Sequence, residues 1–270
     1  ERLLRIAAAW DHDLANLELR RMIERGQARS ANPLGERLAL TEALIARGIP
    51  GGYYDMARML ETGSTVARDP VLALRYYRKA ADLGSPEAQY LVAGYLAPID
   101  RAPEVARQMR RCAAMQGHGR AAEALGIDLA TDTFHGAGGS YTEAIQAFQW
   151  GIQAGIPTAA LALRDGFDGP TPDNQLDYLA QQKDPERVRR YGLIQRFLSD
   201  YSYLDPKVPD VDDIVPLPPA PLPPWDGTLR WKVEFDANVP PPLPEAAVID
   251  DMARTKGLDP RTGRPAGQPD

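Results

Sequence analysis

Cysteine, histidine and long apolar runs are scarce in this chain of 270 residues. The single cysteine, Cys112, excludes a disulfide within the chain. The three histidines, His12, His118 and His135, lie far apart, and no Cys or His pair has the spacing of metal ligands. No stretch approaches the roughly 18 consecutive apolar residues that a membrane-spanning helix needs. We therefore expect no metal site, no cofactor and no transmembrane segment in this sequence.

The sequence also lacks the usual signatures of catalysis. It has no Gly-x-Ser-x-Gly turn for a nucleophilic serine. The glycine-rich stretch FHGAGGS, residues 134–140, lacks the final Lys-Ser/Thr pair and the preceding strand of a phosphate-binding loop, so we interpret it as a connection between helices. Cys112 lies in an alanine-rich segment, where a small core residue is expected. We expect no catalytic residues, and an enzyme is only a distant alternative.

The charge and composition favour a folded protein with a protein partner. Apolar residues make up 44% of the chain and charged residues 25%, as in folded domains. The formal net charge of -6 disfavours non-specific binding to nucleic acid. The same charge would favour a basic partner and would mainly raise the rate of association.

Proline content divides the sequence near residue 205. Ten prolines lie in residues 1–205 and fifteen in residues 206–270, and the second region holds 11 acidic and 7 basic residues. Proline disfavours both helices and central strands. We therefore predict a helical body over residues 1–205 and a proline-rich acidic tail over residues 206–270.

Four glycines indicate a repeat in the body. Gly48, Gly84, Gly117 and Gly155 each end an alanine-rich apolar run, at intervals of 36, 33 and 38 residues. Glycine is favoured where a helix ends because it adopts the left-handed backbone conformation without strain. The glycines therefore predict a series of helical units of similar length.

The unit at residues 52–84 shows the pattern most clearly. Residues 52–60 and 70–82 form two apolar-periodic segments separated by a loop, which predicts a helical hairpin. Two such hairpins would bury their apolar faces by stacking. Further helices are expected at residues 13–26, 34–48, 87–96, 103–117, 121–130, 141–155, 158–166 and 185–201, with another within residues 174–182.

This pattern resembles the Sel-one-like repeats, short relatives of the tetratricopeptide repeat. The resemblance covers roughly residues 11–166 and is best at residues 52–118. It implies an all-α, right-handed solenoid of stacked helical hairpins with a concave face, whose usual role is protein–protein interaction. The matching residues are Gly63, Val66, Asp69, Ala73, Tyr76, Tyr77, Lys79, Ala80, Ala81, Gly84, Ala88 and Gln89.

The tail allows two interpretations. Residues 212–227, DDIVPLPPAPLPPWDG, could be a disordered linker or an extended strap on the solenoid with Trp225 as an anchor. Residues 229–236 alternate apolar and polar side chains, which predicts a strand. Residues 244–257 predict a short helix that ends at Gly257. Apart from these two elements, we expect a mostly extended tail.

The order of repeats and tail also resembles a group of bacterial repeat proteins. Some of that group are immunity proteins against toxins of the type VI secretion system, and their partners include phospholipase D-type lipase effectors. The resemblance implies an immunity protein that blocks the active site of such an effector, in the periplasm. Because the sequence starts at Glu1, an upstream targeting or lipid-anchor segment is conceivable. The alternative is a general scaffold or regulatory adaptor, with a cytoplasmic location.

The repeat pattern also predicts where a partner would bind. In each hairpin the first helix lines the concave face. The match places Met56–Ala57, Val92–Ala93 and Leu125–Gly126 in the packed interior. The alternative is that the groove-facing positions are ordinary solvated residues or lie under the tail. Those positions, our candidate partner-binding residues, are Tyr54, Arg58, Glu87, Tyr90, Arg120 and Glu123.

Overall fold

The computed structural model describes residues 1–98 and 101–267, and in this part of the chain helices are joined by turns and irregular segments without a named strand. The predicted all-α class is therefore confirmed. The chain forms two compact units, unit 1 (Glu1–Ser85 and Pro240–Asp270) and unit 2 (Pro86–Val239). The predicted domain boundary at residue 205 stays a prediction. The two regions that it separates include residues 99–100 and 268–270, which lie outside the described residues.

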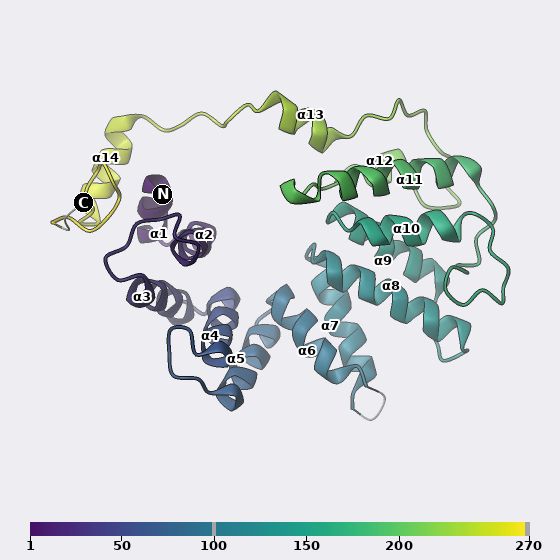
Figure 1. Cartoon of the computed structure of the whole chain (residues 1–270), viewed down its shortest axis with the longest axis horizontal. Coiled ribbons are helices and arrows are strands. Elements are labelled where there is room, and N and C mark those ends of the chain that lie inside the picture. Colours follow the sequence, from purple (N-terminus) through teal and green to yellow (C-terminus); the bar gives the residue numbers. More distant parts are fainter. Residues whose placement is uncertain (99–100, 268–270) are drawn as a thin grey trace. The chain divides into compact units, whose positions relative to one another are not determined.

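Unit 1 consists of helices that pack in chain order (Figure 1). α1 contacts α2, α2 contacts α3, α3 contacts α4, and α4 forms a hairpin with α5. The helices are α1 (Arg2–Ala9), α2 (Asp13–Glu24), α3 (Pro33–Ala46), α4 (Pro50–Thr62), α5 (Pro70–Asp82) and α14 (Ala246–Thr255).

Unit 2 continues the hairpin pattern. α6 pairs with α7, α8 with α9, and α10 with α11, while α9 also packs on α10. Figure 1 shows α8 to α11 lying side by side. The helices are α6 (Pro86–Leu96), α7 (Pro103–Met115), α8 (Gly119–Phe134), α9 (Tyr141–Gln153), α10 (Pro157–Gly166), α11 (Pro185–Asp200), η1 (Ser202–Leu204), α12 (Val211–Ile214) and α13 (Arg230–Ala237).

Glycine and proline set the helix ends as the sequence predicts. The four repeat glycines, Gly48, Gly84, Gly117 and Gly155, have φ angles of 74°, 97°, 84° and 89°, in the left-handed region. Helices α3, α4, α5, α7, α10 and α11 have proline in the first turn, where the missing N–H has no intrahelical partner to lose. The boundaries of the hairpins therefore depend on residues at the helix ends themselves, which a sequence alone can reveal.

The core of unit 2 is one apolar cluster built from α8 to α12. Phe148, Ile152, Leu163 and Tyr191 are among its fully or almost fully buried members. Small residues let the helices approach closely: a Cβ added at Gly126 would lie 2.7 Å from the Phe148 ring. The three interior pairs predicted from the repeat match are buried as expected.

The proline-rich segment after α11 lies against α9 and α11 within unit 2. Val208, Val211, Ile214 and Val215 are buried in the same cluster, and Leu217, Leu222 and Trp225 pack on it. Two buried arginines of α11 hold the segment by its carbonyl oxygens. Arg187 donates hydrogen bonds to Pro216 and Ala220, and Arg190 donates to Ile214 and Pro223.

Two predicted elements are wrong. Residues 229–236 contain most of helix α13 rather than a strand, because Trp231 and Phe235 stack at i,i+4 spacing with ring centroids 5.0 Å apart. No helix forms within residues 174–182, since the side chain of Asn174 accepts hydrogen bonds from the backbone N–H groups of Leu176 and Asp177 and holds a turn. Three helices, α12, α13 and α14, interrupt the tail, for which the sequence predicts a mostly extended form with one helix.

The C-terminal helix α14 packs on the N-terminal helix α1 within unit 1. Ile6, Ile249 and Ala253 form a small buried cluster. The indole N–H of Trp10 donates to the carbonyl oxygen of Met252, 3.1 Å away, and Arg2 forms an ion pair of 2.8 Å with Asp250. Helix α14 agrees with the helix expected at residues 244–257, and Gly257 after it has a φ angle of 67°.

Candidate functional site

The six predicted partner-binding residues lie on the first helices of three hairpins. Tyr54 and Arg58 are on α4 in unit 1, and the other four are on α6 and α8 in unit 2. Each set is a separate candidate surface. Arg58, Glu87 and Arg120 are exposed, whereas Tyr54, Tyr90 and Glu123 are half-buried. Partner binding by these residues stays a prediction.

The two predicted tyrosines also have packing roles. The rings of Tyr54 and Tyr77 lie 5.6 Å apart, and Tyr90 lies 4.9 Å from the His118 ring. His118 caps helix α8, because its Nδ1 accepts a hydrogen bond of 3.1 Å from the backbone N–H of Ala121. Burial lowers the pKa of His118, which favours the neutral ring that this cap requires.

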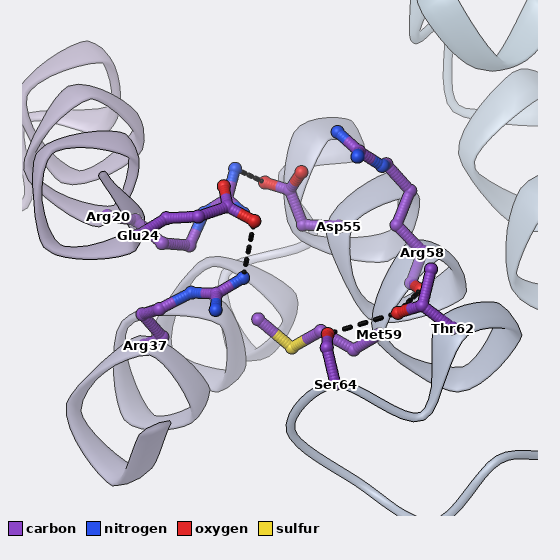
Figure 2. Close-up of a pocket in the computed structure, with 8 residues that line it drawn as sticks. All are labelled: Arg20, Glu24, Arg37, Asp55, Arg58, Met59, Thr62 and Ser64. Atoms are coloured by element: carbon purple, nitrogen blue, oxygen red, sulfur yellow. Dashed lines mark hydrogen bonds and ion pairs between the residues drawn. The ribbon is translucent and has the colours of Figure 1, made fainter. Parts of the chain in front are cut away.

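Arg58 lines a pocket of about 140 Å³ in unit 1 (Figure 2). The side chains come from α2, α3, α4 and the loop after α4, so neighbouring hairpin elements together form the wall. The lining residues are Arg20, Glu24, Arg37, Asp55, Arg58, Met59, Thr62 and Ser64.

Charged pairs fix the floor of this pocket. Arg20 forms a buried ion pair with Asp55, and Arg37 donates from Nη2 to Glu24 at 2.9 Å (Figure 2). Burial lowers the pKa of Arg20 and raises the pKa of Asp55, and the attraction between the two charges opposes both shifts. Three arginines and two carboxylates line the pocket, and two of these arginines, Arg20 and Arg37, are already paired with Asp55 and Glu24.

Glu123 lines a larger groove of about 530 Å³ in unit 2. Helices α8 and α10 form two walls, and residues 175–179 form the third. Most of the lining is apolar, with carboxylates at Glu123, Asp165 and Asp177. The predicted Glu123 thus belongs to a concave site, whereas Glu87, Tyr90 and Arg120 do not line this groove.

Sequence reasoning missed most of this groove, although the repeat contained a signal for part of it. The glycine intervals of 36, 33 and 38 residues place Arg58, Gly94, Ile127 and Asp165 at equivalent repeat positions. Ile127 and Asp165 both line the groove. Carrying the repeat position of Arg58 into the two later repeats would have found them, but the loop residues Leu176 and Asp177 have no repeat equivalent.

The histidines, the glycine-rich stretch and the cysteine that the sequence analysis considered as possible catalytic or metal-binding residues do not come together in one site. His12, like His118, caps a helix through Nδ1, and the stretch at residues 134–140 connects α8 to α9 as predicted. Cys112 is exposed on α7 rather than buried, because it lies on the side of α7 away from the buried Ala113 and Ala114.

Within residues 1–98 and 101–267, no cluster of three His, Cys, Asp or Glu side chains is placed to hold a metal ion. In the same described residues, none of the helices has both the length and the apolar character needed to cross a membrane.

Comparisons with known families match two parts of the chain. The Sel1 repeat matches residues 50–85 and again residues 86–118. A domain of unknown function, DUF6396, matches residues 159–266, which include the groove-lining Asp165 and most of the proline-rich tail. No curated protein matches the sequence.

Solved structures share the fold at low sequence identity. The immunity protein PA5088 from Pseudomonas aeruginosa is 24% identical, with a TM-score of 0.56 over 78% of this chain and 76% of that one. Pseudomonas aeruginosa 5086 (PA5086) is also 24% identical, with a TM-score of 0.54 over 81% and 80%. A Sel1 repeat protein from Oxalobacter formigenes is 20% identical, with a TM-score of 0.53 over 71% and 75%.

These findings agree with the helices and with the predicted repeat. The two Sel1 matches coincide with the hairpins α4–α5 and α6–α7, where the sequence resemblance is best. The structural likeness extends the same fold over most of the chain and supports the predicted class of stacked helical hairpins. The chain therefore carries two Sel1 repeats, at residues 50–85 and 86–118.

Proposed function

We propose that this protein binds a toxin effector and neutralises it, as an immunity protein. The observation that supports the proposal most is the likeness to the solved immunity protein PA5088, which extends over 78% of this chain. Repeats of stacked helical hairpins present extended concave surfaces, which suit the binding of another protein. The two concave sites, one on each unit, offer side chains for such contacts.

The effector in this proposal is a phospholipase D-type lipase of the type VI secretion system. The order of Sel1 repeats followed by a proline-rich tail supports this assignment, because it resembles bacterial proteins that neutralise such effectors. Neutralisation takes place in the periplasm, where a lipase toxin delivered from another cell would meet membrane phospholipid.

Inhibition follows from binding, without chemistry by this chain. A protein bound over the active site excludes the substrate, so the inhibitor needs only shape and charge complementarity. The exposed Arg58, Glu87 and Arg120 offer charged contacts at the two candidate surfaces. Such contacts mainly set specificity and the association rate.

Co-expression tests the proposal. The effector whose gene neighbours that of this chain is exported to the periplasm of Escherichia coli, with this chain exported, kept in the cytoplasm, or absent. We expect growth to be restored only by the exported chain, together with a complex of the two purified proteins.

A catalytically inactive effector provides the control for toxicity. A chain that neither binds the effector nor restores growth from either compartment would refute the proposal and favour a general scaffold. Restored growth from the cytoplasm alone would refute the periplasmic location while leaving immunity intact.

A further inference from the structure

We propose that the groove between α8, α10 and residues 175–179 binds a basic amphipathic segment of the partner protein, with an apolar side chain in the groove and lysine or arginine at its rim. The proposal rests on the proposed function in that the partner is the effector. The groove itself is a feature of unit 2 and can be tested without the effector.

The floor of the groove is apolar and belongs to two first helices. Ile127 from α8 and Leu161 and Ala162 from α10 line it, and the buried Phe148 of α9, a second helix, completes it. At about 530 Å³, the groove has room for several side chains of a partner, within the usual range of binding pockets. Ile127 is 53% exposed, so part of this apolar surface faces solvent.

The third wall is a loop held in a defined position. Leu179 is buried against Gly166, the Tyr178 ring packs edge-on against Tyr141 at 5.5 Å, and Gln175 contacts His135 at 2.9 Å. These three contacts fix the loop on both sides of Leu176.

Leu176 nevertheless points away from the core, with 88% of its surface exposed. A loop anchored by buried and aromatic contacts keeps a large apolar side chain in solvent at the edge of an apolar groove. Exposed apolar side chains grouped in this way are typical of protein interaction sites. Leu176 therefore provides an apolar contact for a partner side chain that enters the groove.

The charge of the lining selects the partner. Glu123, Asp165 and Asp177 are carboxylates, and no lysine or arginine is among the described residues that line the groove. Asp165 pairs with the neighbouring Arg164 at 2.7 Å, Asp177 accepts a hydrogen bond of 3.0 Å from Asn174, and Glu123 accepts one from Thr158. In the part of the chain that the structure describes, Glu123 and Asp177 thus have neutral hydrogen-bond partners only, so the groove favours a cationic segment.

Peptide selection on the intact chain tests this proposal. Phage-displayed random peptides of about 16 residues, which can form four helical turns, are selected on the full chain. We expect the enriched peptides to combine several Lys or Arg residues with Leu, Ile or Phe. Enrichment of acidic or uncharged peptides would overturn the proposal.

A matched pair of variants locates the binding. The groove variant carries Glu123→Gln, Asp165→Asn and Asp177→Asn, and the control variant loses the same charge through Glu104→Gln, Asp200→Asn and Glu234→Gln, at exposed positions of unit 2 outside the groove. The groove variant should bind the selected peptides about tenfold more weakly by fluorescence anisotropy. The control variant should match the wild type within about twofold.

Equal loss of binding in both variants would overturn the groove and indicate a general effect of charge. Circular dichroism confirms that both variants fold, and Leu176→Ser provides a second test that leaves the charge unchanged. Effector binding is then measured with the same variants. If the wild type binds the peptides but not the effector, the proposed function alone is refuted. If the groove variant binds the effector as strongly as the wild type does, the groove alone is refuted.

Discussion

Arg190 on α11 donates a hydrogen bond of 2.7 Å from Nη2 to the carbonyl oxygen of Pro223. Its Nη1 donates another, also of 2.7 Å, to the carbonyl oxygen of Ile214. Proline has no N–H group, so a proline-rich segment leaves its neighbours with acceptors and few donors. The buried guanidinium of Arg190 supplies two of these missing donors, and in this way helix α11 holds residues 214–223 of the tail within unit 2.

Arg190→Met should destabilise unit 2 by about 1–3 kcal/mol, because it leaves buried carbonyl oxygens without a donor. Arg189→Met is the matched control, since Arg189 and Arg190 both contact Glu186 and both lie over the Trp225 ring, but of the two it is Arg190 that donates to the carbonyl oxygens of the tail. The control should stay within about 0.5 kcal/mol of the wild type in urea unfolding. Equal destabilisation by the two substitutions would mean that the tail contacts contribute nothing.

Gly126→Ala should destabilise the packing of α8 on α9 by about 1–3 kcal/mol, because the added methyl group would overlap the Phe148 ring. Gly94→Ala is the control. A Cβ at Gly94, on helix α6, meets nothing within 4 Å, and alanine is the better helix former. Thermal unfolding should therefore show a lower Tm for the first variant and an equal or higher one for the second. A Gly126→Ala protein as stable as the Gly94→Ala protein would contradict the close helix contact.

The hairpins could be predicted because the residues that define them act locally. Gly84 ends α5 through its own backbone angle, and Pro70 starts that helix through its own ring. Alanine spacing then identified the buried faces, such as Ala57 and Ala93, both fully buried. The candidate residue Arg58 lines a pocket for the same reason, since its repeat position determines the side of the helix on which it lies.

The remaining features depend on contacts between distant residues. Leu229, Trp231, Val233 and Phe235 alternate as in a strand, but Trp231 stacks on Phe235 and packs edge-on against Phe197, which favours a helix. Only the i,i+4 aromatic pair was visible in the sequence. The groove wall at Leu176 depends on the packing of Tyr178 on Tyr141, 37 positions earlier in the chain, which no local pattern indicates.

His118 should make stability depend on pH. Burial lowers its pKa in the folded protein below the ordinary value of 6.5, so the folded state binds this proton less tightly than the unfolded state does. The resulting stability is fully present above pH 6.5 and is lost as the pH falls toward and below the lowered pKa. Protonation of Nδ1 would also remove the acceptor for Ala121 at the start of α8.

His118→Asn tests this pH effect, because asparagine can cap the helix without titrating near neutral pH. Urea unfolding at pH 7.5 and pH 5, on either side of the ordinary histidine pKa of about 6.5, should show a larger loss of stability in the wild type than in the variant. Nearby Glu87 and Arg120 remain in both proteins and so do not account for a difference. Identical pH profiles would assign the effect to other groups.

Ile249→Ala should release α14 from α1 and lower the free energy of unfolding of this contact by about 2 kcal/mol. This is the low end for a buried isoleucine, because the apolar cluster around Ile249 is small. Val248→Ala is the control on the same helix, since Val248 is 49% exposed. Hydrogen exchange at residues 246–258 should become faster in the first variant and stay unchanged in the second. Unchanged protection in both would show that the apolar contact with Ile6 does not hold α14.

The central claim is the proposal that this chain inhibits an effector by binding it. The most direct measurement is the phospholipase activity of the purified effector encoded beside this chain, assayed on lipid vesicles as the purified chain is added. The account predicts that activity falls to background once the chain saturates the effector. Full activity with the chain in large excess would contradict it.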